Sequence, residues 1–211
     1  MAKLQKSNFK STSISILFLM IGVLTILSCK KEQPLKDENF ELNVTDSLKP
    51  ELAKKIFLFF KNENYDSIAK YIHPTENLRF SQYNFADIKN DNFFSSETFL
   101  LLVKNPVPIL WGSYDATGDT IFKNWIQYNR KFVFDVDFSK PEKFSINKSF
   151  SNGNSIDNLD KVYKNSQFAE AYYSGFDAKY QGLDWRTLKL VFKKHNNKWC
   201  LVGVIHNQWT S

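Results

Sequence analysis

The sequence predicts an α+β fold, in which N-terminal helices pack on a curved antiparallel sheet that closes with a long C-terminal β-hairpin. Two patterns lead to this prediction. Apolar residues recur at helical spacing in the first part of the domain, whereas apolar and polar residues alternate near the C-terminus, as they do in strands. Helices first and long antiparallel strands last are the element order of an α+β domain.

The helices are predicted from apolar spacing and from residues that start or stop a helix. In the first helix, Leu52, Ile56 and Phe60 recur at helical spacing, and Pro50 is tolerated in a first turn. Ser95 or Ser96 caps a later helix. A last helix starts at Thr120, with one face formed by Ile121, Trp125, Tyr128 and Phe132. The other predicted helices cover residues 50–61, 65–72 and 96–104.

The closing hairpin is the clearest strand signal. Leu188, Leu190 and Phe192 alternate with residues 189, 191 and 193, which predicts a half-buried strand. Residues 195–198 form the turn, and residues 199–209 return as a strand that is apolar on both faces through Val204, which is typical of a central strand. Shorter extended segments are predicted at residues 77–83, 109–114, 132–138 and 168–174.

The first 28 residues are predicted to be a secretion signal. Lys3, Lys6 and Lys10 precede an uncharged segment whose apolar core runs from Ile16 to Leu27. This core is shorter than the roughly 20 residues that a membrane-spanning helix needs. It ends at Ile26-Leu27-Ser28-Cys29, which matches the lipobox of bacterial lipoproteins. An uncleaved membrane anchor, or a plain signal peptide followed by a chance cysteine, is the alternative.

Lipidation of Cys29 would make this residue the N-terminus of the mature chain and its membrane anchor. A diacylglyceryl group joins the sulfur, the peptidase cuts after Ser28, and the new amino group can be acylated, for example with palmitate. Two or more acyl chains anchor a protein stably. Residues 29–46 are expected to form a polar tether, and residues 47–211 a single domain.

The residues after the cysteine also predict where in the cell envelope the protein resides. Residue 30 is Lys, not the Asp that retains enteric lipoproteins in the inner membrane. Lys30-Lys31-Glu32 resembles the surface-export signals of Bacteroidetes lipoproteins. The outer membrane is therefore expected rather than the inner one.

Composition excludes several classes of function. Three of the 28 Lys and Arg residues lie in the signal, which leaves 25 against 22 Asp and Glu and lowers the net charge from +6 to +3. Such a balance, without a basic cluster, is not that of a nucleic-acid-binding protein. Cys200 is the only cysteine after Cys29, so the mature domain has no intrachain disulfide. Its thiol is expected to be an inert core group.

The sequence contains three histidines, which are candidate functional groups. His73 precedes a proline at a predicted helix end, where a capping or surface role is favoured over a functional one, and His195 lies in the hairpin turn and is expected to face solvent. His206 lies near the end of the central strand, on the face expected for Val202 and Val204. It either points into a cavity or is a buried, hydrogen-bonded structural histidine.

Other polar residues lie among aromatic ones. Arg186 could bind a carboxylate bidentately or pair with Asp184 to fix its loop. The acidic turn that begins at Asp115 lacks the ligand spacing of an EF-hand. Asp135 and Asp137 share a strand face without a histidine in register. No zinc-protease motif, phosphate loop, nucleophile elbow or paired C-x-x-C occurs, so no metal and no cofactor is expected.

Four blocks together resemble a group of uncharacterised bacterial secreted and lipid-anchored proteins. In that group the blocks read R-F-S-P-Y, W-G-x-Y-D-G-x-G, D-W-R-x-L and H-D-Q-W. Here they are residues 79–83, 111–119, 182–188 and 204–209. Gln82 replaces the proline, Ala116 a glycine, and Asn207 the acid beside His206. The last change puts an acid–base role of His206 in doubt.

The element order is also similar to the nuclear-transport-factor-2-like, or cystatin-like, fold. This resemblance implies a cone-like sheet that encloses a pocket. The fold serves enzymes and binding modules alike, so it does not assign a function.

The favoured hypothesis is a non-catalytic, lipid-anchored module of the cell envelope that binds a small ligand or an envelope protein in an aromatic cavity. The residues expected to line or support that cavity are Arg79, Tyr83, Trp111, Asp115, Asp184, Arg186 and His206. The rival is an envelope hydrolase or isomerase in which His206 works with Asp115 or Asp184, about 2.6–3.2 Å away. A third possibility, an assembly protein, predicts an exposed apolar patch and no pocket.

Overall fold

A computed structural model describes residues 47–150 and 156–209 of the chain. The predicted signal peptide of residues 1–28, the predicted lipid site Cys29 and the tether of residues 29–46 lie outside the described residues. The helices within the described ranges are all too short or too polar to span a bilayer.

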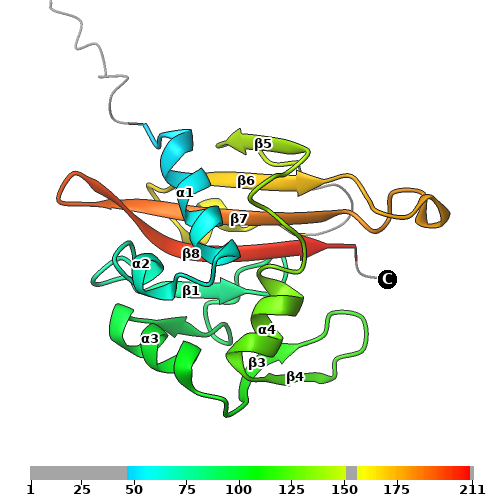
Figure 1. The fold of residues 1–211 in the computed structure, drawn as a ribbon, viewed down its shortest axis with the longest axis horizontal. Coiled ribbons are helices and arrows are strands. Elements are labelled where there is room, and N and C mark those ends of the chain that lie inside the picture. The colour runs from blue at the N-terminus through cyan, green and yellow to red at the C-terminus, as the bar shows by residue number, and fades with distance from the viewer. Residues whose placement is uncertain (1–46, 151–155, 210–211) are drawn as a thin grey trace, which may run out of the picture. The chain divides into compact units, whose positions relative to one another are not determined.

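The described part of the chain is a mixed α+β structure with an open, curved sheet (Figure 1). In chain order, the elements are α1 (Pro50–Lys61), α2 (Tyr65–Ala69), β1 (Leu78–Ser81), β2 (Phe93–Phe94), α3 (Ser96–Lys104), β3 (Ile109–Ser113), β4 (Thr120–Lys123), α4 (Trp125–Phe132), β5 (Lys143–Ile146), α5 (Leu159–Val162), β6 (Gln167–Tyr173), η2 (Ala178–Tyr180), β7 (Arg186–His195) and β8 (Lys198–Gln208). Six strands form one sheet in the order β2-β1-β8-β7-β6-β5, and β3 and β4 form a separate two-stranded sheet.

The predicted combination of early helices and a closing hairpin is confirmed, but the sheet is not antiparallel throughout. β7 and β8 form the hairpin, whereas β1 pairs with β8 in parallel. Parallel neighbours need a long connection between them, and most of the domain separates these two strands in the chain.

α1 and α3 form as predicted, because their start signals are local. Pro50 lies in the first turn of α1. The hydroxyl of Ser95 accepts a hydrogen bond from the Thr98 amide and caps α3. α2 ends at Ala69, three residues before the predicted end.

The region after Thr120 differs from the prediction. Residues Thr120–Lys123 form strand β4, and α4 begins only at Trp125, behind a capping box made by Asn124 and Gln127. Ile121 is still buried, as are Trp125, Tyr128 and Phe132. The apolar spacing of these four residues thus identified core residues, although they do not lie on one continuous helix. The predicted strand at residues 132–138 is the end of α4 followed by turns.

The C-terminal hairpin turns at Asn196 and Asn197, which have φ values of 47° and 60°. Two consecutive residues with positive φ match the twist of the strands they join, as in a type I′ turn. The predicted turn is therefore confirmed.

The register of β7 and β8 shifts near the middle of the hairpin, which leaves Val202 as the extra residue of a β-bulge. We expected Val202 and Val204 to share a face with His206. Instead Val202 packs in the small apolar cluster of Ile205, whereas Val204 packs in the large cluster with the helices. An extra residue in one strand reverses the alternation of side chains that follows it.

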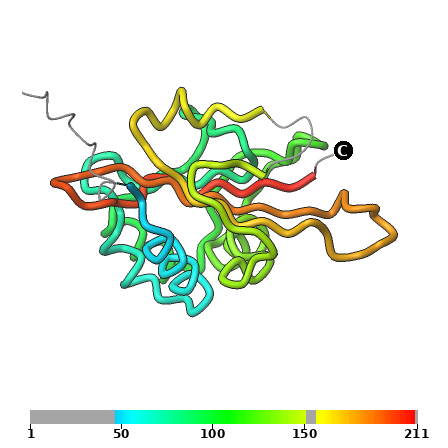
Figure 2. Tube along the Cα trace, turned by 90° about the horizontal axis from the view of Figure 1, so that it is seen from above, coloured from blue at the N-terminus to red at the C-terminus, as the bar shows by residue number. Residues whose placement is uncertain are grey.

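Both faces of the sheet are covered, so β7 is not half-buried as predicted. Figure 2 shows the helices on one side of the sheet and the yellow segment that contains α5 on the other. Residues 187–192 are all buried, and Lys189 among them is 1 % exposed. Its ammonium group donates hydrogen bonds to Asn84 Oδ1 at 2.7 Å and to Asp157 Oδ2 at 2.6 Å. The ion pair between Lys189 on β7 and Asp157 holds the segment before α5 against the sheet.

The two partners of this ion pair differ in their access to water, which predicts unequal effects of removing them. Asp157→Asn leaves the buried ammonium without its counter-charge, and we expect it to lower the free energy of unfolding by about 3 kcal/mol. Lys189→Met leaves only Asp157, whose side chain is 39 % exposed, so we expect a smaller loss. Urea denaturation of both variants tests this, and a larger loss in Lys189→Met would contradict it.

Candidate functional site

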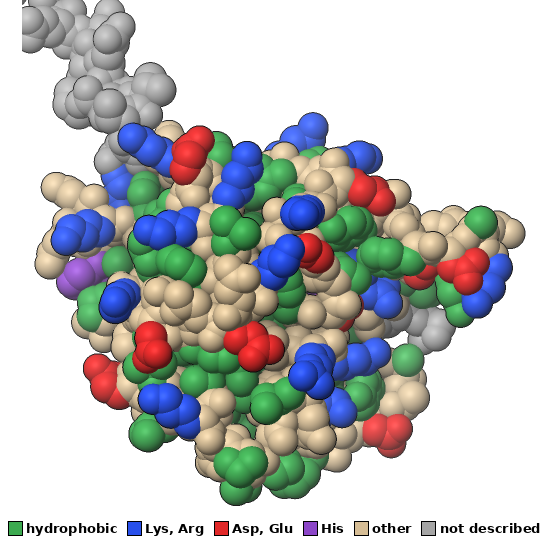
Figure 3. All heavy atoms as spheres, in the orientation of Figure 1, with side chains coloured by type: hydrophobic (Ala, Val, Ile, Leu, Met, Phe, Trp, Pro, Cys, Tyr) green, Lys and Arg blue, Asp and Glu red, His purple; other side chains and the backbone are tan. Residues whose placement is uncertain are grey.

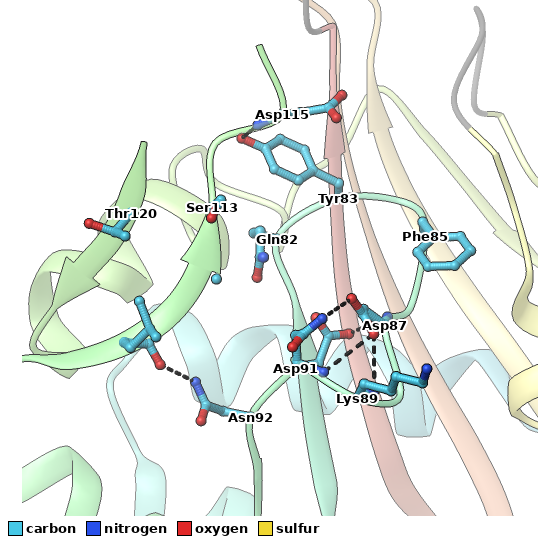
Figure 4. A pocket seen from close by; sticks show the side chains of 13 residues that line it. Gln82, Tyr83, Phe85, Asp87, Lys89, Asp91, Asn92, Ser113, Asp115 and Thr120 are labelled. Atoms are coloured by element: carbon cyan, nitrogen blue, oxygen red, sulfur yellow. Dashed lines mark hydrogen bonds between the residues drawn. The ribbon is translucent and has the colours of Figure 1, made fainter. Parts of the chain in front are cut away.

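A hollow of about 760 Å³ lies between the segment that follows β1 and the β3–β4 hairpin (Figure 4). We call it the rim pocket. Most of its lining side chains are polar. They are Gln82, Tyr83, Phe85, Asp87, Lys89, Asn90, Asp91, Asn92, Leu110, Gly112, Ser113, Asp115 and Thr120.

Asp91 is the most buried acid of the rim pocket, at 6 % exposure. Its Oδ2 atom accepts hydrogen bonds from the Ser81 hydroxyl at 2.5 Å and from the Asp87 amide at 2.9 Å. Burial raises the pKa of Asp91 to about 6, against the lowering effect of these hydrogen bonds and of Arg79. Asp91 therefore titrates in a range where an ordinary aspartate is already charged.

Asp87 starts the turn that carries Asp91. Its carboxylate accepts hydrogen bonds from the amides of Lys89 and Asn90 and, at 2.6 Å, from the Asn90 side chain, and the latter contact lowers its pKa. The Arg79 guanidinium donates to the main-chain carbonyls of Asp87 and Asp91. The turn is thus stabilised by the Arg79 guanidinium, which binds its main-chain carbonyls, and by the Asp87 carboxylate, which binds its amides.

Gln82 lies between this turn and β3, as Figure 4 shows. It is 8 % exposed, and its Oε1 atom has no hydrogen-bond partner among the described residues. The amide fits against β3 only because residue 112 is glycine. A Cβ atom there would come within 2.4 Å of Gln82 Nε2, and the φ of Gly112 is +129°.

Two hydrogen bonds join the walls of the rim pocket. The Asp115 amide donates to the Tyr83 hydroxyl at 3.3 Å, and the Asn92 side chain donates to the Leu110 carbonyl at 2.7 Å (Figure 4). Burial raises the pKa of Tyr83 above its ordinary value. These contacts hold the β3–β4 hairpin at a fixed distance from the segment after β1.

Three of the seven predicted ligand-binding residues therefore belong to the rim pocket. Tyr83 and Asp115 line it, and Arg79 supports its turn. Trp111 does not line it. Its ring is fully buried and stacks on Tyr128 at a centroid distance of 3.6 Å, so it is a core residue.

The other three lie elsewhere, and two of them share one ion-pair cluster. His206 Nε2 is 3.2 Å from Asp135 Oδ1, and Arg186 Nε donates to Asp135 Oδ2 at 2.9 Å. Burial acts to raise the pKa of Asp135, but His206 and Arg186 outweigh it and hold the pKa below its ordinary value. The carboxylate partner of His206 is thus Asp135, and neither of the acids named in the rival hypothesis.

His206 is completely buried, and its ring lies against Phe132 and Phe138. Its Nδ1 atom has no hydrogen-bond partner in the described parts of the chain. This arrangement matches the structural alternative for His206. Asp135 was missed as its partner because residues 132–138 were expected to form a strand.

Asp184 fixes its own loop and does not pair with Arg186 through its side chain. Its Oδ2 atom accepts hydrogen bonds from the Phe176 and Asp177 amides, both at 2.9 Å. Arg186 donates to the main-chain carbonyls of Asp184 and Trp185. The acid and the arginine therefore support the loop separately.

The remaining reactive side chains have local roles. α2 ends at Ala69, so His73 neither caps a helix nor lies on the surface as predicted: it is buried, and its Nδ1 atom accepts hydrogen bonds from the Thr75 and Glu76 amides within a turn. Burial lowers its pKa. The His195 ring packs edge-on against His73 and is only partly exposed. Burial raises the pKa of the Cys200 thiol.

The residues that sequence reasoning missed are mainly Gln82, Asp87, Asp91 and Asn92. A signal was present, since residues 87–92 are polar except for Ile88 and follow a predicted strand by a few residues. Within the described ranges, no group of three or more His, Cys, Asp or Glu side chains is placed to hold a metal ion.

Exposed apolar side chains also gather near this end of the domain. Figure 3 shows them at the lower end of the view, over the region of α3, β3 and β4. The exposed apolar residues of this region are Leu101, Val107, Leu110, Phe122 and Ile126. Leu110 pairs with Phe122 across the hairpin. The assembly hypothesis expected such a patch without a pocket, whereas both occur here.

No protein-family model matches the chain, and no curated protein matches it. Among solved structures, the chain is similar to a designed nuclear-transport-factor-2-like protein whose title begins "Rd1NTF2". The identity is 14%, the match covers 74% of this chain and 97% of that chain, and the TM-score is 0.28. A TM-score of this size carries no argument about function.

The Asp135 cluster predicts a pH-dependent loss of stability. Asp135→Asn removes the counter-charge of Arg186, and we expect the free energy of unfolding near pH 7 to fall by about 3 kcal/mol. Because the folded-state pKa of Asp135 is depressed, its stabilising effect is present above the unfolded-state pKa and is lost as the pH falls through the folded-state pKa. The difference between the variant and the parent should therefore shrink as the pH falls below about 4.

Urea denaturation near pH 7, and at the lowest pH at which both proteins still fold, measures both values. Asp66→Asn, an exposed position in α2, is the matched control. An equal loss at both pH values would mean that the effect of Asp135→Asn does not come from its charge.

Proposed function

We propose that this chain is a lipid-anchored protein of the bacterial cell envelope, attached through Cys29 to the outer membrane, and that its domain binds a small polar ligand in the rim pocket. The ligand-binding part rests on one observation. Gln82 and Asp91 line an open hollow although both are more than nine-tenths buried, and Gln82 Oε1 has no hydrogen-bond partner among the described residues.

A buried acceptor without a donor is unfavourable, because it has given up its hydrogen bonds to water. A ligand that donates to Gln82 would restore that hydrogen bond. The volume of the rim pocket lies within the range of small-molecule sites.

The blocks that resemble lipid-anchored bacterial proteins also support the proposal. The block of residues 79–83 supplies one wall of the rim pocket, and that of residues 111–119 supplies the opposite wall. The blocks of residues 182–188 and 204–209 meet on β7 and β8, where Arg186 and His206 contact Asp135. We infer membership of this group, and a cone-like fold of the nuclear-transport-factor-2 type, from this arrangement of helices on an open, curved sheet.

The geometry favours binding over acid–base catalysis by His206. A general acid or base must reach the proton that it transfers. The ring of His206 is fully buried beside Phe132 and Phe138, so a substrate would first have to displace these rings.

Ligand binding is tested by incubating the purified protein with a polar small-molecule extract of the cells that produce it, followed by native mass spectrometry. We expect at least one bound species with the parent protein. Gln82→Leu should reduce it at least tenfold, because it removes the unpaired amide. Gly112→Ala should act in the same way by displacing the Gln82 amide.

Asp66→Asn serves again as the control, and it should retain the bound species. The proposal is wrong if no species binds the parent protein, or if Gln82→Leu binds the same species equally well.

Lipid anchoring is tested by expressing the full chain in a diderm bacterium fed with labelled palmitate. We expect Cys29→Ala to abolish the label and to shift the protein out of the membrane fraction, because the acylated sulfur is lost. Cys200→Ala, at the only other cysteine, should stay labelled and membrane-bound. A labelled Cys29→Ala protein would contradict the proposed site.

A further inference from the structure

The rim pocket carries more negative than positive charge. Asp87, Asp91 and Asp115 line it, against Lys89 as the one lining cation. Arg79 lies close by and adds a second positive charge, which still leaves three acids against two cations. The field in the hollow therefore favours a cationic ligand over an anionic one.

Two acceptor atoms of the rim pocket lack a donor among the described residues. Both protein donors to Asp91 bind its Oδ2 atom, and its Oδ1 atom accepts no hydrogen bond from the described residues. Gln82 Oε1 likewise has no donor there. An ammonium group offers three N–H donors together with a positive charge, and it lacks any acceptor of its own. An ammonium group therefore complements a carboxylate oxygen and an amide oxygen that line the same hollow without donors.

We propose that the rim pocket binds a small molecule that carries a protonated primary amine, which Asp91 and Gln82 recognise. This inference rests on the proposed function of the rim pocket. The side chains around these two residues suit a ligand with hydroxyl groups, since Asn90, Ser113 and Thr120 offer both donors and acceptors. The shared chemistry of an amino sugar and of an aliphatic diamine is the ammonium group.

The alternative is that Asp91 only stabilises its turn. Asparagine would do this as well, because one amide oxygen can accept the hydrogen bonds of both Ser81 and Asp87. Burial disfavours the ionised carboxylate, and the raised pKa means that the charge of Asp91 destabilises the fold progressively as the pH rises from about 4 to about 6. A merely structural role therefore gives no reason for a carboxylate at this position.

The charge of Asp91 also predicts how binding depends on pH. The groups that face it are Arg79, Asp87 and the hydroxyls of Tyr128 and Tyr163. Lowering the pH below about 6 protonates Asp91, whereas an amine ligand stays charged. Binding of the amine should therefore weaken as the pH falls from 7 to 5.

The test is isothermal titration of the purified protein with glucosamine, N-acetylglucosamine and putrescine near pH 7, repeated near pH 5. We expect glucosamine, putrescine or both to bind, N-acetylglucosamine to bind at least tenfold more weakly than glucosamine, and binding to weaken at least fivefold near pH 5. Tighter binding of glucosamine than of putrescine would assign the ligand to the hydroxylated amines, and the reverse to the diamines.

Asp91→Asn is the matched variant, with Asp66→Asn as its control for charge. We expect Asp91→Asn to weaken amine binding at least tenfold and to remove its pH dependence. It should unfold at a temperature equal to or above that of the parent near pH 7. If Asp91→Asn does not fold, Gln82→Leu provides the second variant, and it should also weaken amine binding.

Equal binding of glucosamine and N-acetylglucosamine, unchanged binding by folded Asp91→Asn and Gln82→Leu, or no binding of either amine would overturn the inference. The amine inference can also fail while the proposed ligand-binding function of the rim pocket holds. A neutral species that binds the parent protein but not Gln82→Leu in the extract experiment would keep the rim pocket as a ligand site while excluding the amine.

Discussion

The rest of the structure depends on the burial of strand β8, which has a neighbouring strand on each side and is covered on both faces of the sheet. β8 pairs with β7 along nearly its whole length and with β1 in parallel, and residues 201–207 are buried. The helices cover one face of the sheet and the segment with α5 covers the other. Because Ser81 pairs with Ile205, the chain leaves the sheet at Gln82, where the rim pocket begins. The position of the candidate site is thus set by the register of a strand that contributes no residue to it.

Aromatic packing explains why the candidate site lies at the edge of the domain. Trp111 stacks on Tyr128, and the rings of Phe80, Phe99 and Trp125 pack around them. All of these rings are buried. Rings that fill the space between helices and sheet contribute strongly to stability. These rings fill the space between helices and sheet, so the hollow with its polar lining lies at the edge of that space.

Three largely buried charges among the described residues illustrate a difference between structural groups and candidate functional ones. Asp135 faces Arg186 and His206, and Lys189 faces Asp157, so each buried charge has a partner within hydrogen-bond distance. Asp91 is held only by a hydroxyl and a main-chain amide, and its pKa is raised instead of lowered. A charge that is unfavourable for folding in a hollow open to ligands is typical of a binding site.

The sequence by itself determined the elements whose signals are local. Helical spacing and Ser95 defined α1 and α3, and alternation with two asparagines defined the C-terminal hairpin. The tertiary structure decided what depends on contacts between distant segments. These are the parallel pairing of β1 with β8, the burial of Lys189, the β-bulge at Val202 and the partner of His206.

The same division applies to the candidate site. Tyr83 and Asp115 were predictable, because they lie in motifs with aromatic neighbours. Gln82 and Asp91 are ordinary polar residues of a loop in the sequence. They become special only in the assembled fold, where both are more than nine-tenths buried, since burial raises the pKa of a carboxyl and leaves an amide without a partner. Local sequence encodes where a helix or a strand forms, whereas desolvation is a property of the assembled fold.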